Sequence, residues 1–145
     1  MTCRFLLQSE DFTMEKLSTI EEVRAFFSKD KFATENGAVV DTFADKYAVC
    51  SLVIDDRHRN ALGGVMGGVP FMLADFAFAV ATNHQGNVVV SLSSNISFCG
   101  VAKGEKLIAE AKCVKDGRST CYYVIDVKDE LDNMVAVVTI NGFKK

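Results

Sequence analysis

The sequence predicts a single domain of the α+β class, in which a sheet of about six strands wraps around one long helix. Residues 67–83 form an apolar run with helical character, and Asp75 is the one charged side chain in it. A helix that is apolar all round is normally buried. Most of the remaining chain consists of strand-like segments separated by turns. The 145 residues, 49% of them hydrophobic, suit one domain with a sizeable core.

The chain is expected to start with an extension and a short amphipathic helix. Residues 1–13 are too short and too soon acidic for a secretory signal, and we expect them to be a flexible N-terminal extension. Ser18 and Glu21 have the spacing of a capping box. Apolar residues then recur at helical spacing, namely Ile20, Val23, Phe26 and Phe27. The pattern predicts a helix that ends near Asp30.

Two strands and the long helix are expected next. The dipeptide Asn36-Gly37 is typical of a turn, and residues 38–40 and 46–54 after it are strand-like. The helix follows the glycine-rich loop 60–68. Pro70 is compatible with it because the first helical turn needs no backbone N–H from that residue.

Four strand-like segments follow the helix, which the sequence HQGN at residues 84–87 is expected to end. Residues 103–104, 116–117 and 129–133 are turn-like and separate these segments. We therefore expect an antiparallel meander. The four strands are expected at residues 88–98, 106–115, 119–128 and 134–143.

Composition excludes several classes of protein. The net charge of −3 and the absence of a basic stripe argue against a nucleic-acid-binding protein. No uninterrupted apolar stretch reaches the length of a membrane span. The five cysteines are odd in number and lack C-x-x-C spacing, which argues against disulfides and a zinc site and favours the cytoplasm. His58 and His84 are far apart, so a histidine metal site is not expected, and each is assigned to the surface or a turn.

Asp75 is the first candidate for chemistry. A carboxylate inside an apolar helix must be paired, hydrogen-bonded or shifted in pKa. The alternative is that Asp75 lies on the one wet face of its helix. Gly67 and Gly68 lie about two turns before it, at the expected helix start, where free backbone N–H groups and the positive end of the helix dipole collect. Glycine also lets a ligand approach that backbone closely.

The central motif resembles a known family. Residues 58–68, HRNALGGVMGG, followed by residues 71–75, FMLAD, are similar to the signature H-x-N-x-x-G-x-x-H-G-G-x-x-F-x-L-A-D of PaaI-type hotdog-fold acyl-CoA thioesterases. The likeness extends over residues 20–142. It includes residues 26–33, FFSKDKFA, and residues 95–98, NISF, after the helix.

The resemblance implies a hotdog fold, a central helix wrapped by a curved antiparallel sheet, as one domain over residues 1–145. It further implies a homodimer or homotetramer with sites at the dimer interface, and hydrolysis of acyl-CoA thioesters without a metal or cofactor. Asp75 would be the nucleophile or the base for water. Gly67 would supply a backbone N–H to the thioester oxygen, and Gly68 would adjoin the substrate.

Two further residues are carried over from the resemblance. Asn60 would position the substrate or the water, and its alternative role is to cap a turn. Ser91 would make a polar contact with the substrate, and its alternative is a plain place in a strand. The acyl group is not specified, because the aromatic and methionine side chains of the helix suit an apolar pocket or the core equally. These are Phe71, Met72, Phe76 and Phe78.

Met66 departs from the family pattern, which has histidine at this position. Methionine has no N–H donor, so the reaction is expected to be weaker, and Met66 is expected to pack against the acyl chain or the dimer partner. The departure leaves a rival interpretation open, a non-catalytic acyl-CoA-binding or regulatory protein. A hotdog dehydratase is less favoured, because His58 and His84 both lie outside the helix interior.

Overall fold

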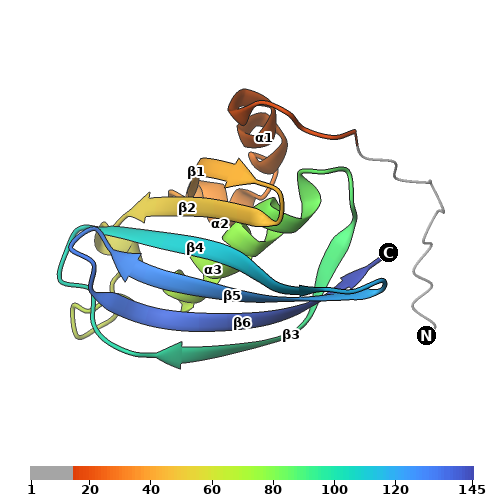
Figure 1. Ribbon diagram of the computed structural model, residues 1–145. Coiled ribbons are helices and arrows are strands. Elements are labelled where there is room, and N and C mark those ends of the chain that lie inside the picture. The colour runs from red at the N-terminus through yellow and green to blue at the C-terminus, as the bar shows by residue number, and fades with distance from the viewer. Residues whose placement is uncertain (1–14) are drawn as a thin grey trace, which may run out of the picture.

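The computed structural model describes residues 15–145 and confirms the α+β class. One long helix, α3 (Gly68–Asn83), lies on the concave side of a six-stranded sheet that curves around it (Figure 1). The predicted start and end of this helix are correct. The expected N-terminal extension, residues 1–13, lies outside the described residues.

The sheet has the strand order β1-β2-β4-β5-β6-β3, and all neighbouring strands are antiparallel. Every predicted strand is present. The bounds are β1 (Val39–Ala44), β2 (Tyr47–Val53), β3 (Val89–Phe98), β4 (Lys106–Asp116), β5 (Thr120–Asp129) and β6 (Met134–Lys144).

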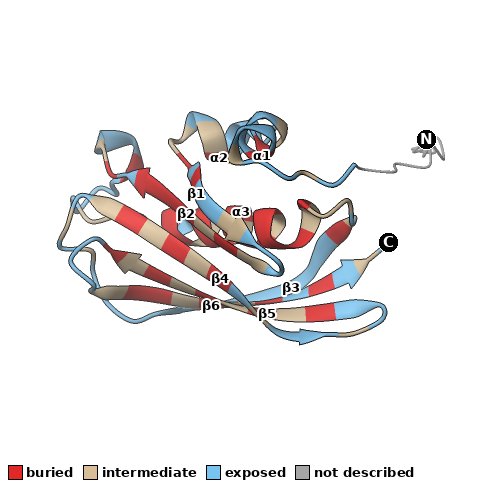
Figure 2. Ribbon diagram, turned by 45° about the horizontal axis from the view of Figure 1, so that its top comes forward, coloured by how far each residue is buried: buried red, intermediate tan, exposed pale blue. Residues whose placement is uncertain are grey.

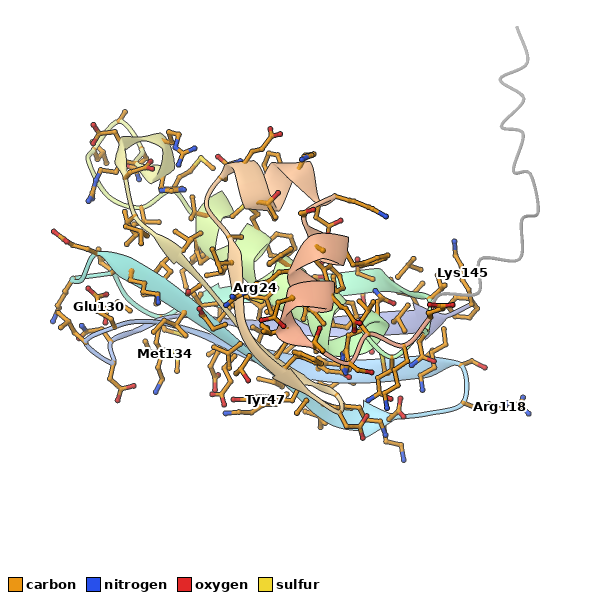
Figure 3. The ribbon with its side chains drawn as sticks, turned by 90° about the horizontal axis from the view of Figure 1, so that it is seen from above. Arg24, Tyr47, Arg118, Glu130, Met134 and Lys145 are labelled. Atoms are coloured by element: carbon orange, nitrogen blue, oxygen red, sulfur yellow. The ribbon has the colours of Figure 1, made fainter. Side chains whose placement is uncertain are left out.

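The predicted meander is correct for β4, β5 and β6 and wrong for β3. Strand β3 pairs with β6, so residues 99–105 cross the end of the sheet instead of forming a hairpin. The carboxylate of Asp129 holds this crossing, accepting the backbone N–H groups of Lys103 at 2.8 Å and Gly104 at 3.1 Å. Glu130, at the same end of the sheet (Figure 3), accepts the N–H of Glu105 at 2.7 Å. Strand patterns in a sequence do not state which strands pair, because that depends on such distant anchors.

The core lies between α3 and the concave face of the sheet. Residues along β5 and the first half of β4 alternate between buried and partly exposed (Figure 2), as expected for a sheet with one covered face. Phe78 of α3 packs edge-on against Tyr123 of β5, with ring centroids 5.3 Å apart. Leu73 and Val80 of the same helix are fully buried. This burial fixes the rotation of α3 about its axis, and so decides which of its side chains face away from the sheet.

Strand β3 is different, because nearly all of it is exposed (Figure 2). Within residues 15–145 its only neighbouring strand is β6, so β3 forms an edge of the sheet. Its exposed side chains include the apolar Val90, Leu92 and Phe98. A long edge strand with exposed apolar side chains is a surface that natural proteins usually cover.

Two short helices precede the sheet. Helix α1 (Ile20–Phe27) has a capping box formed by Thr19 and Glu22, one residue later than the predicted pair. The backbone N–H of Ser18 also donates to the carboxylate of Glu22, at 2.8 Å. Arg24 ties this helix to β1 by donating from Nε to the carbonyl oxygen of Val40, at 2.9 Å (Figure 3).

Helix α2 (Lys31–Glu35) was not predicted, because five residues are too few for a periodic pattern to be visible. The third short element is the 3₁₀ helix η1 (Asp56–His58). No helix in residues 15–145 combines the length and the apolar composition that crossing a bilayer requires.

Both histidines lie at turns, as one of the two predicted alternatives states, but both are buried, so the other alternative, a surface position, is wrong. His58, in the turn of η1, accepts the backbone N–H of Asp55 at Nδ1 (2.9 Å) and donates from Nε2 to the carbonyl oxygen of Asn36 (2.7 Å). His84 caps α3, with Nδ1 at 2.8 Å from the carbonyl oxygen of Val80. Hydrogen bonds to backbone groups let both imidazole rings be buried, and a sequence does not reveal such partners.

Candidate active site

The face of α3 that turns away from the sheet borders an open pocket of about 610 Å³. This volume lies in the range of small-molecule binding sites. Residues from three segments line the pocket: the α1–α2 connection with α2, the start of α3, and the exposed face of α3. They are Asp30, Lys31, Phe32, Ala33, Met66, Gly68, Phe71, Met72, Asp75, Phe76 and Ala79.

Asp75 lies in the middle of this lining, on α3. It is half-buried, and its carboxylate makes no hydrogen bond or ion pair with any of residues 15–145. Burial raises the pKa of Asp75, and the nearby negative charge of Asp30 raises this pKa further. The partial exposure of Asp75 fits the alternative in which it lies on the solvent-facing side of its helix. Its raised pKa is also typical of carboxyl groups that transfer protons in active sites.

The start of α3 offers two free backbone donors. Gly67 is the N-cap residue, and Gly68 is the first residue of the helix. Neither of their N–H groups donates a hydrogen bond within the described part of the chain, whereas those of Met66 and Val69 donate to the carbonyl oxygens of His58 and Met66. Free N–H groups at the positive end of a helix dipole suit a developing oxyanion.

Apolar side chains surround these donors closely. A Cβ atom added to Gly67 would lie 2.9 Å from a ring carbon of Phe98, and one added to Gly68 would lie 2.8 Å from the terminal methyl of Met66. A larger residue at either position would therefore displace the half-exposed side chain of Phe98 or Met66. Phe98 comes from the end of β3, and its ring lies against the start of α3, a contact that sequence reasoning missed. Strand periodicity gives no sign that its ring reaches the start of the helix.

Met66 and three apolar side chains of α3 line the pocket. Met66 is 51% exposed and lines the pocket, next to Gly68. Phe71, Met72 and Phe76 also line it, and of the four apolar candidates on the helix only Phe78 is purely core. The pocket thus has an apolar wall on the side of α3.

Asn60 and Ser91 are not brought to the pocket within one chain. The side-chain oxygen of Asn60 accepts the backbone N–H groups of Leu62 at 2.9 Å and Gly64 at 3.2 Å, which is the turn-capping role. Ser91 lies on the exposed edge strand β3, paired with Gly142 of β6. Their proposed contacts with a substrate remain predictions.

The distance between Gly67 and Asp75 along α3 limits how the two residues can act together. Asp75 follows Gly67 by eight residues, so the two lie roughly 12 Å apart along the helix at 1.5 Å per residue. An attacking group and an oxyanion donor must both lie within about 3 Å of one carbonyl group. The backbone N–H of Gly67 and the carboxylate of Asp75 in one chain are therefore too far apart to reach the same carbonyl group.

No three His, Cys, Asp or Glu side chains of residues 15–145 lie together in a way that could hold a metal ion. Among the same residues, Cys50, Cys99, Cys113 and Cys121 are free thiols.

Comparison with known proteins finds thioesterases and esterases among the relatives of this chain. The profile of the Thioesterase superfamily matches residues 62–136. A protein of Archaeoglobus fulgidus with the provisional name of esterase is 34% identical over 127 residues, which are 86% of this chain and 82% of that protein. The acyl-coenzyme A thioesterase PaaI of Escherichia coli is 29% identical over 119 residues, which are 81% of this chain and 84% of that protein.

Solved structures share the fold, and the expected hotdog fold is confirmed. The Escherichia coli PaaI structure superposes with a TM-score of 0.79 and 26% identity, covering 83% of this chain and 88% of that chain. The Streptococcus mutans protein smu.793, solved bound to acetyl CoA, superposes with a TM-score of 0.69 and 26% identity, covering 73% of this chain and 86% of that chain.

Proposed function

This chain belongs to the Thioesterase superfamily, and we propose that it hydrolyses acyl-CoA thioesters to a free acid and CoA without a metal ion. One observation carries the proposal: the half-buried Asp75, which has no hydrogen-bond or ion-pair partner among residues 15–145, lies in a largely apolar pocket of suitable size. The relative from Escherichia coli, named an acyl-coenzyme A thioesterase, supports the same substrate class. The free thiols favour a reducing compartment, the cytoplasm.

In the proposed reaction, Asp75 takes a proton from water as the water attacks the thioester carbonyl, or attacks the carbonyl itself. The carbonyl oxygen gains negative charge and is stabilised by the backbone N–H of Gly67. The C–S bond then breaks and CoA leaves as a thiolate. Water releases the acid directly in the first route and from a mixed anhydride with Asp75 in the second.

We propose that each site combines Gly67 of one copy with Asp75 of another, because roughly 12 Å of helix separates the two within a chain. The exposed edge strand β3 suits a second copy, which would continue the sheet and cover Val90, Leu92 and Phe98. Asn60 and Ser91 would then complete the site from loops and strands that one chain leaves away from its pocket.

Light scattering at micromolar concentration is expected to give twice the chain mass of 15.9 kDa, or a multiple of that dimer. An edge strand that exposes three large apolar side chains is unfavourable in water, and pairing with a second copy removes this exposure. A monomer at that concentration would leave the proposed site without its second half and would contradict the arrangement.

Release of free CoA from a panel of acyl-CoA thioesters tests the function. The rival, a non-catalytic acyl-CoA-binding or regulatory protein, is suggested by Met66 in place of the family's histidine. Turnover supports the enzyme, whereas tight binding of acyl-CoA without CoA release supports the rival.

Met66→His is expected to raise kcat/KM about two- to tenfold, because one regained hydrogen bond is worth about 0.5–1.5 kcal/mol. Met66 is half-exposed at the pocket, so an imidazole there would not be buried without a partner. Kinetics and melting temperatures of wild type and Met66→His decide the matter. Met66→Leu, which keeps an apolar side chain, is the matched control. A folded Met66→His variant with lower turnover would mean that Met66 is adapted to apolar packing.

A further inference from the structure

Asp30 is a second carboxylate on the lining of the pocket, and neither the fold nor the proposed reaction accounts for it so far. It lies between α1 and α2, three residues after the end of α1. It is the N-cap residue of α2, a position where an aspartate side chain normally accepts a backbone N–H. The carboxylate of Asp30 makes no such hydrogen bond. Its side chain instead borders the pocket that Asp75 borders.

Aromatic packing holds Asp30 at this place. Phe27, the last residue of α1, packs edge-on against Phe76, the neighbour of Asp75 in α3, with ring centroids 6.1 Å apart. The backbone N–H of Asp30 donates to the carbonyl oxygen of Phe27 at 3.0 Å. The position of Asp30 relative to Asp75 is therefore set by a short chain of contacts between α1 and α3.

No basic side chain within residues 15–145 forms an ion pair with Asp30 or Asp75. Lys31 is the one basic residue on the lining, and it forms no ion pair with Asp30 or Asp75 within residues 15–145. Lys29 lies over the ring of Phe26, with Nζ at 5.1 Å from the centroid. The rest of the lining is uncharged. Asp30 is exposed and Asp75 is half-buried, and both border the same largely apolar pocket, so solvent screens part of the repulsion between the two negative charges.

We propose that Asp30 assists the proposed hydrolysis as a positioning residue, by placing a second negative charge beside Asp75 and so making Asp75 a stronger base. This inference rests on the proposed function. A carboxylate with an ordinary pKa is a weak base toward water. General-base catalysis improves as the pKa of the base approaches the working pH. Burial raises the pKa of both Asp30 and Asp75, and the charge of Asp30 adds to the effect on Asp75.

Replacing Asp30 by a neutral residue is expected to lower the pKa of Asp75. Removing the charge of Asp30 removes a group that disfavours ionised Asp75, so the pKa of Asp75 falls. The acid limb of the pH profile of kcat/KM then moves to lower pH. Above the acid limb, where Asp75 is ionised in both proteins, the weaker base lowers kcat/KM, on the order of threefold.

The test compares wild type, Asp30→Asn and the control Glu35→Gln, which removes the same charge from the other end of α2. Asparagine keeps the shape of Asp30, and no side-chain hydrogen bond is lost from the helix cap. The pH profile of kcat/KM is measured for all three proteins. In parallel, carbon-13 NMR follows the titration of the Asp75 carboxyl group, assigned by its disappearance in Asp75→Asn.

The expected result is a lower titration midpoint for Asp75 and a shifted acid limb in Asp30→Asn, with both unchanged in Glu35→Gln. An unchanged midpoint in folded Asp30→Asn would overturn the inference, as would an activity loss equal at every pH. If wild type releases no CoA from any thioester, the proposed function fails, and the NMR titration still shows whether Asp30 acts on Asp75.

Discussion

Asp75→Asn is expected to lower kcat/KM on the best acyl-CoA by about 10²- to 10⁴-fold, the usual cost of losing a nucleophile or general base. The amide keeps the shape of the side chain and loses the charge. The fold should be unaffected, because the carboxylate of Asp75 has no hydrogen-bond or ion-pair partner in residues 15–145 that the substitution would leave unpaired.

Stability provides a separate check on this variant. The pKa of Asp75 is raised in the folded chain, so its contribution to stability is present at low pH and is lost as pH rises through that folded value. Above that folded pKa the ionised group destabilises the fold, and there Asp75→Asn should melt at the same temperature as wild type or higher. Undiminished turnover in a folded Asp75→Asn protein would remove this carboxylate from the mechanism. Glu35→Gln controls for the change in net charge.

Gly67→Pro is expected to lower kcat by about 10²- to 10³-fold, the typical cost of one lost oxyanion donor. Proline has no backbone N–H, and its φ of about −65° is close to the φ of −58° that Gly67 already has. The N–H of Gly67 makes no hydrogen bond elsewhere in the described chain, so its removal costs the fold no bond. The change therefore acts on the proposed donor itself.

Gly67→Ala is the matched control, because it adds the same Cβ atom against the ring of Phe98 and keeps the N–H. Kinetics and melting temperatures of both variants separate the donor from the packing. If Gly67→Ala loses as much activity as Gly67→Pro, the crowding of Phe98 and not the N–H is responsible.

Mixing the two variants tests whether a site spans two copies. In a dimer of one Asp75→Asn chain and one Gly67→Pro chain, a shared site joins intact Gly67 of one copy to intact Asp75 of the other. Refolding the two inactive proteins together should then restore about half of the activity for each mixed dimer. If each site were built within one chain, both sites of the mixed dimer would be damaged and the mixture would stay inactive.

The sequence determined the fold class, the single long helix and all six strands, because these follow from local periodicity and turn residues. It also singled out Asp75 and the glycines before it, since a charge in an apolar helix and a glycine pair at a helix start are both local features. One local feature was misjudged, the capping box of Thr19 and Glu22, where two overlapping pairs had the same spacing.

The tertiary structure decided what depends on partners far along the chain. It placed β3 beside β6, buried His58 and His84 against backbone groups, put Phe98 over Gly67 and set Asp30 beside the pocket of Asp75. It also left one side of β3 without a neighbouring strand among residues 15–145, and it placed the two halves of the proposed site apart along one helix. Such contacts join residues that are remote in sequence, and their energies depend on distances and burial that no local pattern contains.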